Sequence, residues 1–431
     1  MLSKWRAGLG LVAVVVCSCL SAPPVSPHDM DGLAEQYVRL VLALGQHDAD
    51  FVDAYHGPEQ WREDARRDEL SLDGISIKAG LLRSTVSAGD LGRDTRVDGQ
   101  RRTLLLKQLT AVQTRADLLR GKKFSFDQEA RLLYDAAPPH YEAGYFESLL
   151  VELDALLPGE GSLSERRSRF RDSFVIPSER LDAVFAAAID ECRKRTIQRI
   201  PLPENERFVV EYVTDKPWSG YNWFQGNAYS LIQLNTDLPI HIDRAVDLAC
   251  HEGYPGHHVF NTLLERELVQ KRGWVEFSVY PLFSPMSLIA EGSANYGIPM
   301  AFSGREREDF ERDVLFPLAG LDASRVDEYY QVEAVVKRLN YAGNEAARAY
   351  LDNEIDADAA VQWLQDYALM SRERAQQRLK FIEKYRSYVI NYNLGKDIVR
   401  EYVEAAGSDS DARWTAFEKI LSTPVSASML Q

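Results

Sequence analysis

The stretch HEGYPGHH, residues 251–258, places three of the chain's eight histidines within eight consecutive positions. Glu252 stands directly beside the first of these histidines. Neutral imidazole is the commonest protein ligand for zinc, and a carboxylate next to such a ligand is the usual general base of a zinc hydrolase. The stretch therefore predicts a metal centre, which the rest of the fold is expected to complete.

The spacing of the histidines constrains the backbone. The stretch comes close to H-E-x-x-H, in which two histidines one helical turn apart bind the same zinc ion, but its next histidine comes two residues late. On a straight helix His258 would share a face with His251, yet lie about 10 Å farther along the axis. Because zinc needs both nitrogens at about 2.0–2.1 Å, we expect Pro255-Gly256 to form a bulge that returns His257 to His251. His258 remains the alternative ligand.

A third ligand is predicted in the segment LIAEGSANYG, residues 288–297. Glu291 is the charged residue among small and apolar neighbours, and burying a carboxylate is costly unless it is paired or bound to a metal. Two histidines, one glutamate and a water molecule make a tetrahedral catalytic zinc site. Asn295, one helical turn later, is expected to support this site. The alternative is that Glu291 is an exposed helix residue.

A β-prone region precedes the metal stretch and its leading helix, residues 242–252. Residues 208–212 and 227–234 show β-propensity, and the second segment alternates between two faces. The edge strand of a sheet has free backbone groups, onto which an extended peptide can add as one more strand. We therefore predict that Asn227 and Tyr229 contact a substrate. A small structural hairpin is the alternative.

Most of the remaining chain has apolar residues three and four positions apart, which predicts a mainly α fold. Because no long linker divides residues 30–431, this segment is expected to form one compact unit. Its N-terminal helical part is 30–200, and its metal-binding part is 201–431. The predicted helical segments are 30–70, 100–119, 126–135, 141–157, 178–195 and 357–391.

The first residues have the character of an export signal. Lys4 and Arg6 precede an apolar run at 9–16, which is shorter than the roughly 20 residues of a membrane span. The run ends in VCSC, which resembles a bacterial lipobox with Cys19 as the lipidated residue. This implies a signal peptide over 1–18, a tether over 19–29, and a lipid anchor in the outer membrane facing the periplasm. The alternative is an ordinary secretory signal with incidental cysteines.

The charge of the chain argues against one kind of partner, and its other two cysteines are expected to be buried. The net charge is -15 and the isoelectric point about 5.1, which argues against a nucleic-acid partner. Cys192 and Cys250 are expected to be two buried small hydrophobic residues rather than a disulfide or metal ligands.

Two motifs together carry a family resemblance. H-E-x-x-P-G-H at 251–257, followed by E-G-x-A-x-Y at 291–296, resembles the bacterial "domain of unknown function 885" family, which is grouped with the gluzincin zinc metallopeptidases. The resemblance implies a large helical zincin-like domain with a small β-sheet whose edge strand lines the active-site cleft. It also implies His251, His257 and Glu291 as ligands and Glu252 as base. Ser293 replaces the family's usual large aromatic residue.

The C-terminal part resembles the family less closely. Its Y-x-x-G element implies that Tyr392 stabilises the oxyanion, with Tyr388 and Tyr385 as alternatives. Only the first two residues of the family's R-L-x-x-D-x-G-x-H run are present, and its histidine is missing. Within that remnant, Arg338 or the neighbouring Lys337 is a candidate for holding a substrate carboxylate.

These observations predict a zinc-dependent peptidase that hydrolyses short peptides with metal-activated water and Glu252 as general base. Two alternatives remain open. The same residues would serve a zinc amidase acting on a non-peptide substrate, and a non-catalytic lipoprotein module would bind the metal without needing the base. Oligomeric state does not follow from the sequence.

Overall fold

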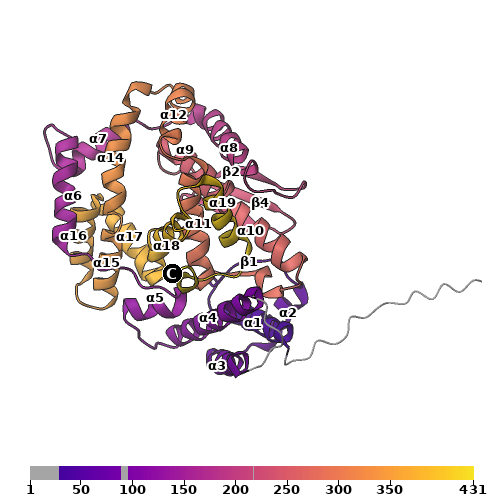
Figure 1. Ribbon diagram of the computed structural model, residues 1–431. Coiled ribbons are helices and arrows are strands. Elements are labelled where there is room, and N and C mark those ends of the chain that lie inside the picture. The colour runs from indigo at the N-terminus through magenta and orange to yellow at the C-terminus, as the bar shows by residue number, and fades with distance from the viewer. Residues whose placement is uncertain (1–28, 89–95, 217) are drawn as a thin grey trace, which may run out of the picture.

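A computed structural model describes residues 29–88, 96–216 and 218–431 of the protein (Figure 1). The fold is mainly α with small sheets, as predicted. Cys19, the predicted signal peptide and the predicted tether up to residue 28 lie outside the described residues. Within the described ranges, no helix has both the length and the apolar character needed to cross a membrane.

The N-terminal part is helical, and local signals set its helix ends. The Asp29 carboxylate accepts the amide hydrogen of Gly32 at 2.7 Å and caps the first helix, while Ser125 and Gln128 form a capping box at the fifth. The helical pattern predicted over 30–70 is interrupted by a short strand. The elements are α1 (Met30–Leu44), β1 (Val52–Tyr55), α2 (Glu59–Asp68), α3 (Leu72–Ala88), α4 (Arg96–Leu119), α5 (Phe126–Tyr134), α6 (Ala143–Leu156), α7 (Leu163–Asp172) and α8 (Leu181–Ile197).

A three-stranded sheet precedes the metal stretch. It contains β2 (Arg207–Val213), β3 (Gly220–Phe224) and β4 (Tyr229–Asn235) in the order β2-β4-β3. β4 is parallel to β2 and antiparallel to β3. The strand predicted at 227–234 is therefore the central strand, and its backbone groups are already paired on both sides. β2 and β3 are the two edge strands of this sheet, and β3 is the one whose residues line the cavity described below.

The metal stretch lies between two helices. α9 (Asp243–Leu248) continues into a π-helical turn, η2 (Ala249–Gly253), and α10 (His257–Leu264) begins after Pro255-Gly256. β5 (Val279–Pro281) then pairs with β1. The later helices are α11 (Pro285–Ala301), α12 (Glu306–Phe310), α13 (Phe316–Ala319), α14 (Val326–Leu339), α15 (Ala342–Leu351), α16 (Ala357–Ala368), α17 (Arg372–Tyr385), α18 (Leu394–Glu404), α19 (Ser410–Ser422) and α20 (Ala427–Leu430).

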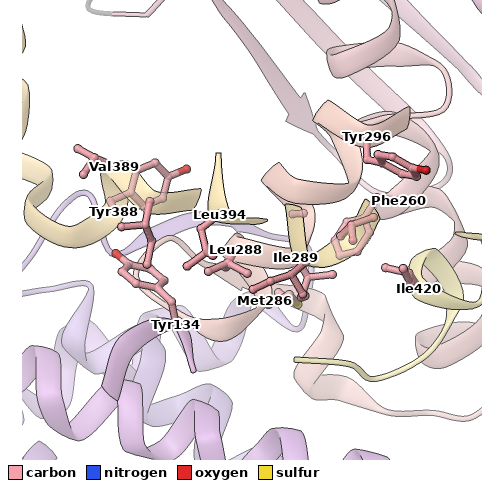
Figure 2. Close-up of a cluster of buried hydrophobic side chains, with 14 of the residues drawn as sticks. Tyr134, Phe260, Met286, Leu288, Ile289, Tyr296, Tyr388, Val389, Leu394 and Ile420 are labelled. Carbon is pink, nitrogen blue, oxygen red and sulfur yellow. The ribbon is translucent and has the colours of Figure 1, made fainter. Parts of the chain in front are cut away.

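α11 is the central element of the core, with α18 and α19 packed against it (Figure 1). Figure 2 shows apolar side chains of α11 among side chains from α5, α10, α18 and α19. Two glycines let the backbones of α11 and α18 touch. A Cβ atom on Gly395 would lie 2.6 Å from the Leu288 carbonyl oxygen, and one on Gly292 would collide with the Gly395 backbone. The C-terminal part of the chain is thereby fixed to the helix that carries Glu291.

The prediction that Cys192 and Cys250 remain separate buried residues is wrong. They form a disulfide that joins α8 to the η2 turn, with 5.7 Å between their Cα atoms. Both residues are fully buried, so the expected burial is correct while the expected chemistry is not. Because Cys250 directly precedes His251, the disulfide anchors the metal stretch to α8.

Candidate metal centre

The break in the histidine motif is a tight bulge. Gly256 donates its amide hydrogen to the Cys250 carbonyl at 2.9 Å, and a Cβ atom on Gly256 would collide with the carbonyl oxygen of His251. Only glycine fits this close approach. The bulge places the Nε2 atom of His257 3.1 Å from the Nε2 atom of His251. The predicted return of His257 toward His251 is therefore present.

Glu291 completes a cluster with these two histidines. Its Oε2 lies 3.4 Å from His251 Nε2, and its Oε1 lies 3.8 Å from His257 Nε2. Oε2 is buried and makes no hydrogen bond of good geometry within the described residues. Three potential ligand atoms, one from each residue, lie within 4.8 Å of one another. Two imidazoles and a carboxylate are the donor set of a catalytic zinc site, so the residues fit this ion.

The surroundings of His257 and Glu291 shift the pKa values of both side chains. Burial lowers the pKa of the His257 imidazole to about 4. Burial opposes the ionisation of Glu291, but the adjacent imidazoles of His251 and His257 and the Tyr388 hydroxyl lower the pKa of its carboxyl below the usual value. A neutral imidazole and an ionised carboxylate are the forms in which these side chains bind a metal.

Glu252 lies beside the cluster in the same cavity. Its main-chain carbonyl accepts a hydrogen bond from Asn222 Nδ2 at 2.7 Å, which ties the η2 turn to the edge strand β3. A Cβ atom on Gly220 would lie 2.9 Å from Glu252 Oε1, so the carboxylate packs directly against the β3 backbone. Burial raises the pKa of this carboxyl to about 7, and the charges of Glu291 and Asp53 act in the same direction.

His258 is fully buried and faces away from the cluster. Its Nε2 donates to Glu206 Oε1 at 3.0 Å, and Ser230 Oγ donates to its Nδ1 at 2.8 Å. The carboxylate can only accept, which fixes this tautomer. Tyr254 also donates to Glu206 Oε1. Glu206 therefore holds the residues on both sides of Pro255-Gly256-His257. His257, rather than the alternative His258, is the histidine that joins the cluster.

Glu206 is itself anchored to α8. Arg193 Nη2 lies 3.1 Å from Glu206 Oε2, and the preceding residue is the disulfide-bonded Cys192. Burial alone would raise the pKa of the Glu206 carboxyl, but hydrogen bonds from His258 and Tyr254 lower it. Two adjacent residues of α8 thus restrain the metal stretch through separate contacts.

The three tyrosines between residues 385 and 392 line the cavity. Tyr388 donates its hydroxyl to Glu291 Oε1 at 3.0 Å and is buried. The Tyr392 ring lies 5.7 Å from the Tyr388 ring and is 39% exposed. Tyr385 packs its ring against Tyr388 and Phe381. Tyr388 therefore forms a hydrogen bond to the Glu291 carboxylate, whereas the Tyr392 side chain is exposed and lines the cavity.

Asn295, predicted to support the site, makes two hydrogen bonds to main-chain carbonyls. Its Nδ2 donates to the Glu291 carbonyl at 3.0 Å and to the Tyr392 carbonyl at 3.3 Å. The side chain therefore connects α11 to the segment that carries Tyr392.

The cluster opens into a cavity of about 1850 Å³. Its lining includes residues of the edge strand β3 and of the metal stretch, together with residues of α14, α17 and α18. Figure 1 shows α14 and α17 to the left of α11 and α10 to its right. Within the wall at β1 and β3, Tyr221 donates to Asp53 Oδ1 at 3.1 Å, and burial raises the pKa of Asp53 to about 6.

Of the three residues predicted to contact substrate, Arg338 lines the cavity and the other two do not. Asn227 and Tyr229 are not among the cavity-lining residues, so the structure corrects that prediction. The Asn227 amide donates to Glu265 Oε1 at 2.7 Å, and the Tyr229 ring packs under the guanidinium of Arg207. They lie at the start of the central strand, and the cavity faces the edge strand β3 instead. Arg338 does line the cavity, with its guanidinium 2.8 Å from Glu152 Oε2.

The site also contains residues that the sequence did not reveal. Glu206, Asp53 and Tyr221 stand in segments without a recognisable motif, and only the tertiary fold brings them to the metal stretch. The sequence does contain a strand signal at Tyr221, because this residue stands in an aromatic-rich run, residues 221–224, beside a β-prone segment.

Comparisons with known proteins are limited to structural similarity. No protein-family model matches the chain, so the predicted resemblance to the "domain of unknown function 885" family is not confirmed. No curated protein matches it either.

Similar solved structures include two candidate lipoproteins and a carboxypeptidase. The protein from Colwellia psychrerythraea is 13% identical with a TM-score of 0.49, over 92% of this chain and 74% of that one. The second, of unknown function and from Shewanella oneidensis, is 12% identical with a TM-score of 0.46, over 94% and 82%. The M32 carboxypeptidase from Deinococcus radiodurans R1 is 12% identical with a TM-score of 0.41, over 91% and 88%. What the site can do is therefore read from its own geometry.

Proposed function

We propose that this protein is a zinc-dependent peptidase that hydrolyses short peptides. The observation that carries the proposal is the convergence of His251, His257 and Glu291 in one cavity, with the carboxylate of Glu252 beside them. These three residues would hold the ion. When bound, zinc supplies Lewis-acid chemistry that lowers the pKa of a water molecule and polarises a carbonyl group.

Glu252 is placed to move the proton. Its carboxylate accepts a proton from the attacking water and then delivers that proton to the leaving amine. Its contact with the β3 backbone keeps it at the wall where an extended substrate would lie.

The edge strand and Tyr392 position the substrate. The free side of β3 offers backbone groups that can pair with an extended peptide. Tyr392 donates its hydroxyl to the oxygen of the scissile carbonyl as negative charge develops there. Tyr388 holds the orientation of Glu291 through its hydrogen bond to Oε1. The enclosed cavity favours short peptides over folded proteins.

The cellular setting of the proposal rests on the first residues. The lipobox-like sequence at Cys19 supports a lipid anchor, and the proposed place of action is the periplasmic face of the outer membrane. Metabolic labelling with a palmitate analogue tests this part. The label is expected on the wild-type chain and lost in Cys19→Ala, and equal labelling of both would contradict it.

The function is tested with the chain purified without residues 1–28 and reconstituted with zinc. Metal content is measured by mass spectrometry, and a mixture of synthetic peptides and acylated amino acids is followed by liquid chromatography. One zinc per chain is expected, with peptide cleavage that stops on chelation and returns with zinc. Stoichiometric zinc with cleavage only of acylated amino acids would indicate an amidase instead. Zinc binding without any hydrolysis would indicate a binding module.

A further inference from the structure

The cavity has the opposite charge balance to the whole chain. The chain has 50 Lys and Arg residues against 65 Asp and Glu residues. The cavity is lined by 12 Lys and Arg residues against 8 Asp and Glu residues. A cationic cavity in an acidic protein concentrates anionic ligands.

Several of these cations already have partners. Arg307 Nη1 lies 2.7 Å from Asp247 Oδ1, and Lys384 Nζ lies 3.0 Å from Asp50 Oδ1. Arg338 pairs with Glu152, as described above. Such pairs maintain the walls of the cavity, and their charges are largely satisfied within the protein.

Arg378 on α17 differs from these cations. It lines the cavity and is half-buried, yet among the described residues it has no hydrogen-bond or ion-pair partner. Its guanidinium carbon lies 4.9 Å from the centre of the Phe381 ring, and a Cβ atom on Gly343 would lie 3.8 Å from its Nη2. The ring and the glycine support the guanidinium without using its N–H groups.

Arg378 is also within electrostatic reach of the proposed oxyanion donor. Burial lowers the pKa of the Arg378 guanidinium, and the Tyr392 hydroxyl is the group that raises it. Arginine nevertheless stays protonated in proteins. A partly desolvated, supported guanidinium with free donors is suited to bind a planar carboxylate through two hydrogen bonds.

We propose that Arg378 binds a carboxylate of the peptide substrate and thereby selects acidic peptides or free peptide C-termini. This proposal rests on the proposed peptidase function. The carboxylate can come from the C-terminus or from an Asp or Glu side chain, since the guanidinium recognises the same group in both. Lys396, which has no ion pair within the part of the chain that the structure describes, also lines the cavity.

The test compares zinc-loaded wild type with Arg378→Gln, Arg378→Lys and Lys384→Gln. Lys384 lies on the same helix and lines the same cavity but is paired with Asp50, so its variant is the matched control. Three forms of one cleavable peptide are used: the free acid, the C-terminal amide, and an amide with a glutamate side chain next to the scissile bond. KM and kcat are measured for each.

For the preferred carboxylate form, Arg378→Gln is expected to raise KM about 10–100-fold, with little change in kcat. Arg378→Lys should retain part of the binding, and Lys384→Gln should behave as wild type. An Arg378-dependent preference for the free acid identifies a terminal carboxylate, and one for the glutamate-containing amide identifies a side-chain carboxylate. Equal KM for all three peptides with wild type, or equal effects of Arg378→Gln on all three, would overturn the proposal.

A binding measurement separates this proposal from the function on which it rests. Calorimetric titration of the zinc-loaded Glu252→Gln variant with the free acid and with the amide needs no turnover. Tighter binding of the acid, lost when Arg378→Gln is added, supports the carboxylate site even if no peptide is hydrolysed by wild type. Absence of hydrolysis by wild type would count against the peptidase function, and equal binding of acid and amide would count against the site at Arg378.

Discussion

Glu252 is the residue whose chemistry can be separated most cleanly from the structure around it. In Glu252→Gln the side chain keeps its size against Gly220, while the ability to accept a proton is lost. We expect hydrolysis to fall about 10²–10⁴-fold, the contribution typical of general acid–base catalysis. Zinc content and melting temperature should stay near wild type. Unchanged peptide hydrolysis with zinc still bound would rule out the assignment of Glu252 as base.

The two tyrosines at the centre are expected to fail in different ways. Tyr388→Phe removes the hydrogen bond to Glu291 Oε1 and should weaken zinc binding about 10–100-fold, as loss of a group that orients a ligand usually does. Tyr392→Phe should lower kcat while zinc affinity stays unchanged. Competition with a fluorescent chelator measures the affinity, and peptide turnover at saturating zinc measures kcat. If Tyr388→Phe alone lowered kcat at full zinc occupancy, the two roles would have to be exchanged.

At the residue scale, much of the cluster could be predicted from the sequence. Proline and glycine inside a histidine motif predict a local distortion, and an isolated glutamate in an apolar helix predicts a partner for its charge. The choice between His257 and His258 could not be made this way, because it depends on Glu206. That carboxylate lies 52 residues before His258 in a loop, and nothing in its local pattern indicates a buried acceptor.

At the scale of elements, the metal stretch depends on contacts to its neighbours. Glu206→Gln keeps the shape but gives Tyr254, His258 and Arg193 a neutral partner with only one acceptor oxygen. We expect the free energy of unfolding to fall by about 1–3 kcal/mol and zinc affinity to fall as well. Urea denaturation of the zinc-free protein and chelator competition measure the two effects. Exposed Glu204→Gln serves as the control, and equal losses in both variants would contradict the anchoring role.

The contact between α11 and α18 should tolerate no side chain. Gly395→Ala would bring a methyl group to 2.6 Å from the Leu288 carbonyl oxygen, and overpacking of this kind costs about 1–3 kcal/mol. Gly144→Ala on α6 is the control, because a Cβ atom there meets no atom of the described residues within 4 Å. Thermal unfolding should show a lower melting temperature for Gly395→Ala and an unchanged melting temperature for Gly144→Ala. An unchanged melting temperature in Gly395→Ala would show that the two helices can separate.

Helices could be predicted where local periodicity is strong. The prediction failed for the position of a strand in the sheet, because that position depends on its pairing partners. α4, α5, α6 and α8 correspond closely to their apolar patterns. The segment at 227–234 is a strand, but its place in the middle of the sheet depends on the parallel partner Arg207–Val213. Strand order is a long-range property, and the alternation of one segment does not contain it. For this reason the alternation alone does not reveal that Asn227 and Tyr229 lie outside the cavity lining.

At the scale of the whole molecule, buried ion pairs couple stability to pH. Burial opposes the ionisation of Asp247, but Arg307 and other nearby cations hold its carboxyl pKa well below the usual value. A carboxyl with a lowered folded-state pKa stabilises the fold above its unfolded-state pKa of about 3.9, and this stabilisation is lost as the pH falls further. We therefore expect the free energy of unfolding of the zinc-free protein to decline below about pH 4.

The variant Asp247→Asn isolates this contribution. It should be less stable than wild type at neutral pH, and its stability should fall less steeply in acid. Exposed Asp366→Asn is the control and should follow the wild-type curve. Urea denaturation at a series of pH values gives the comparison, and parallel curves for wild type and Asp247→Asn would exclude Asp247 as a source of the acid sensitivity.

The contact between Gly292 and Gly395 also sets an order of events during synthesis. The histidines at 251 and 257 leave the ribosome long before Gly395 does. α11 rests on α18 through these two glycines, so Glu291 reaches its final place only after nearly the whole chain has been made. A growing chain would therefore present its histidines without their third partner. If the chain is exported unfolded, the cluster of His251, His257 and Glu291 forms only in the compartment where the chain folds.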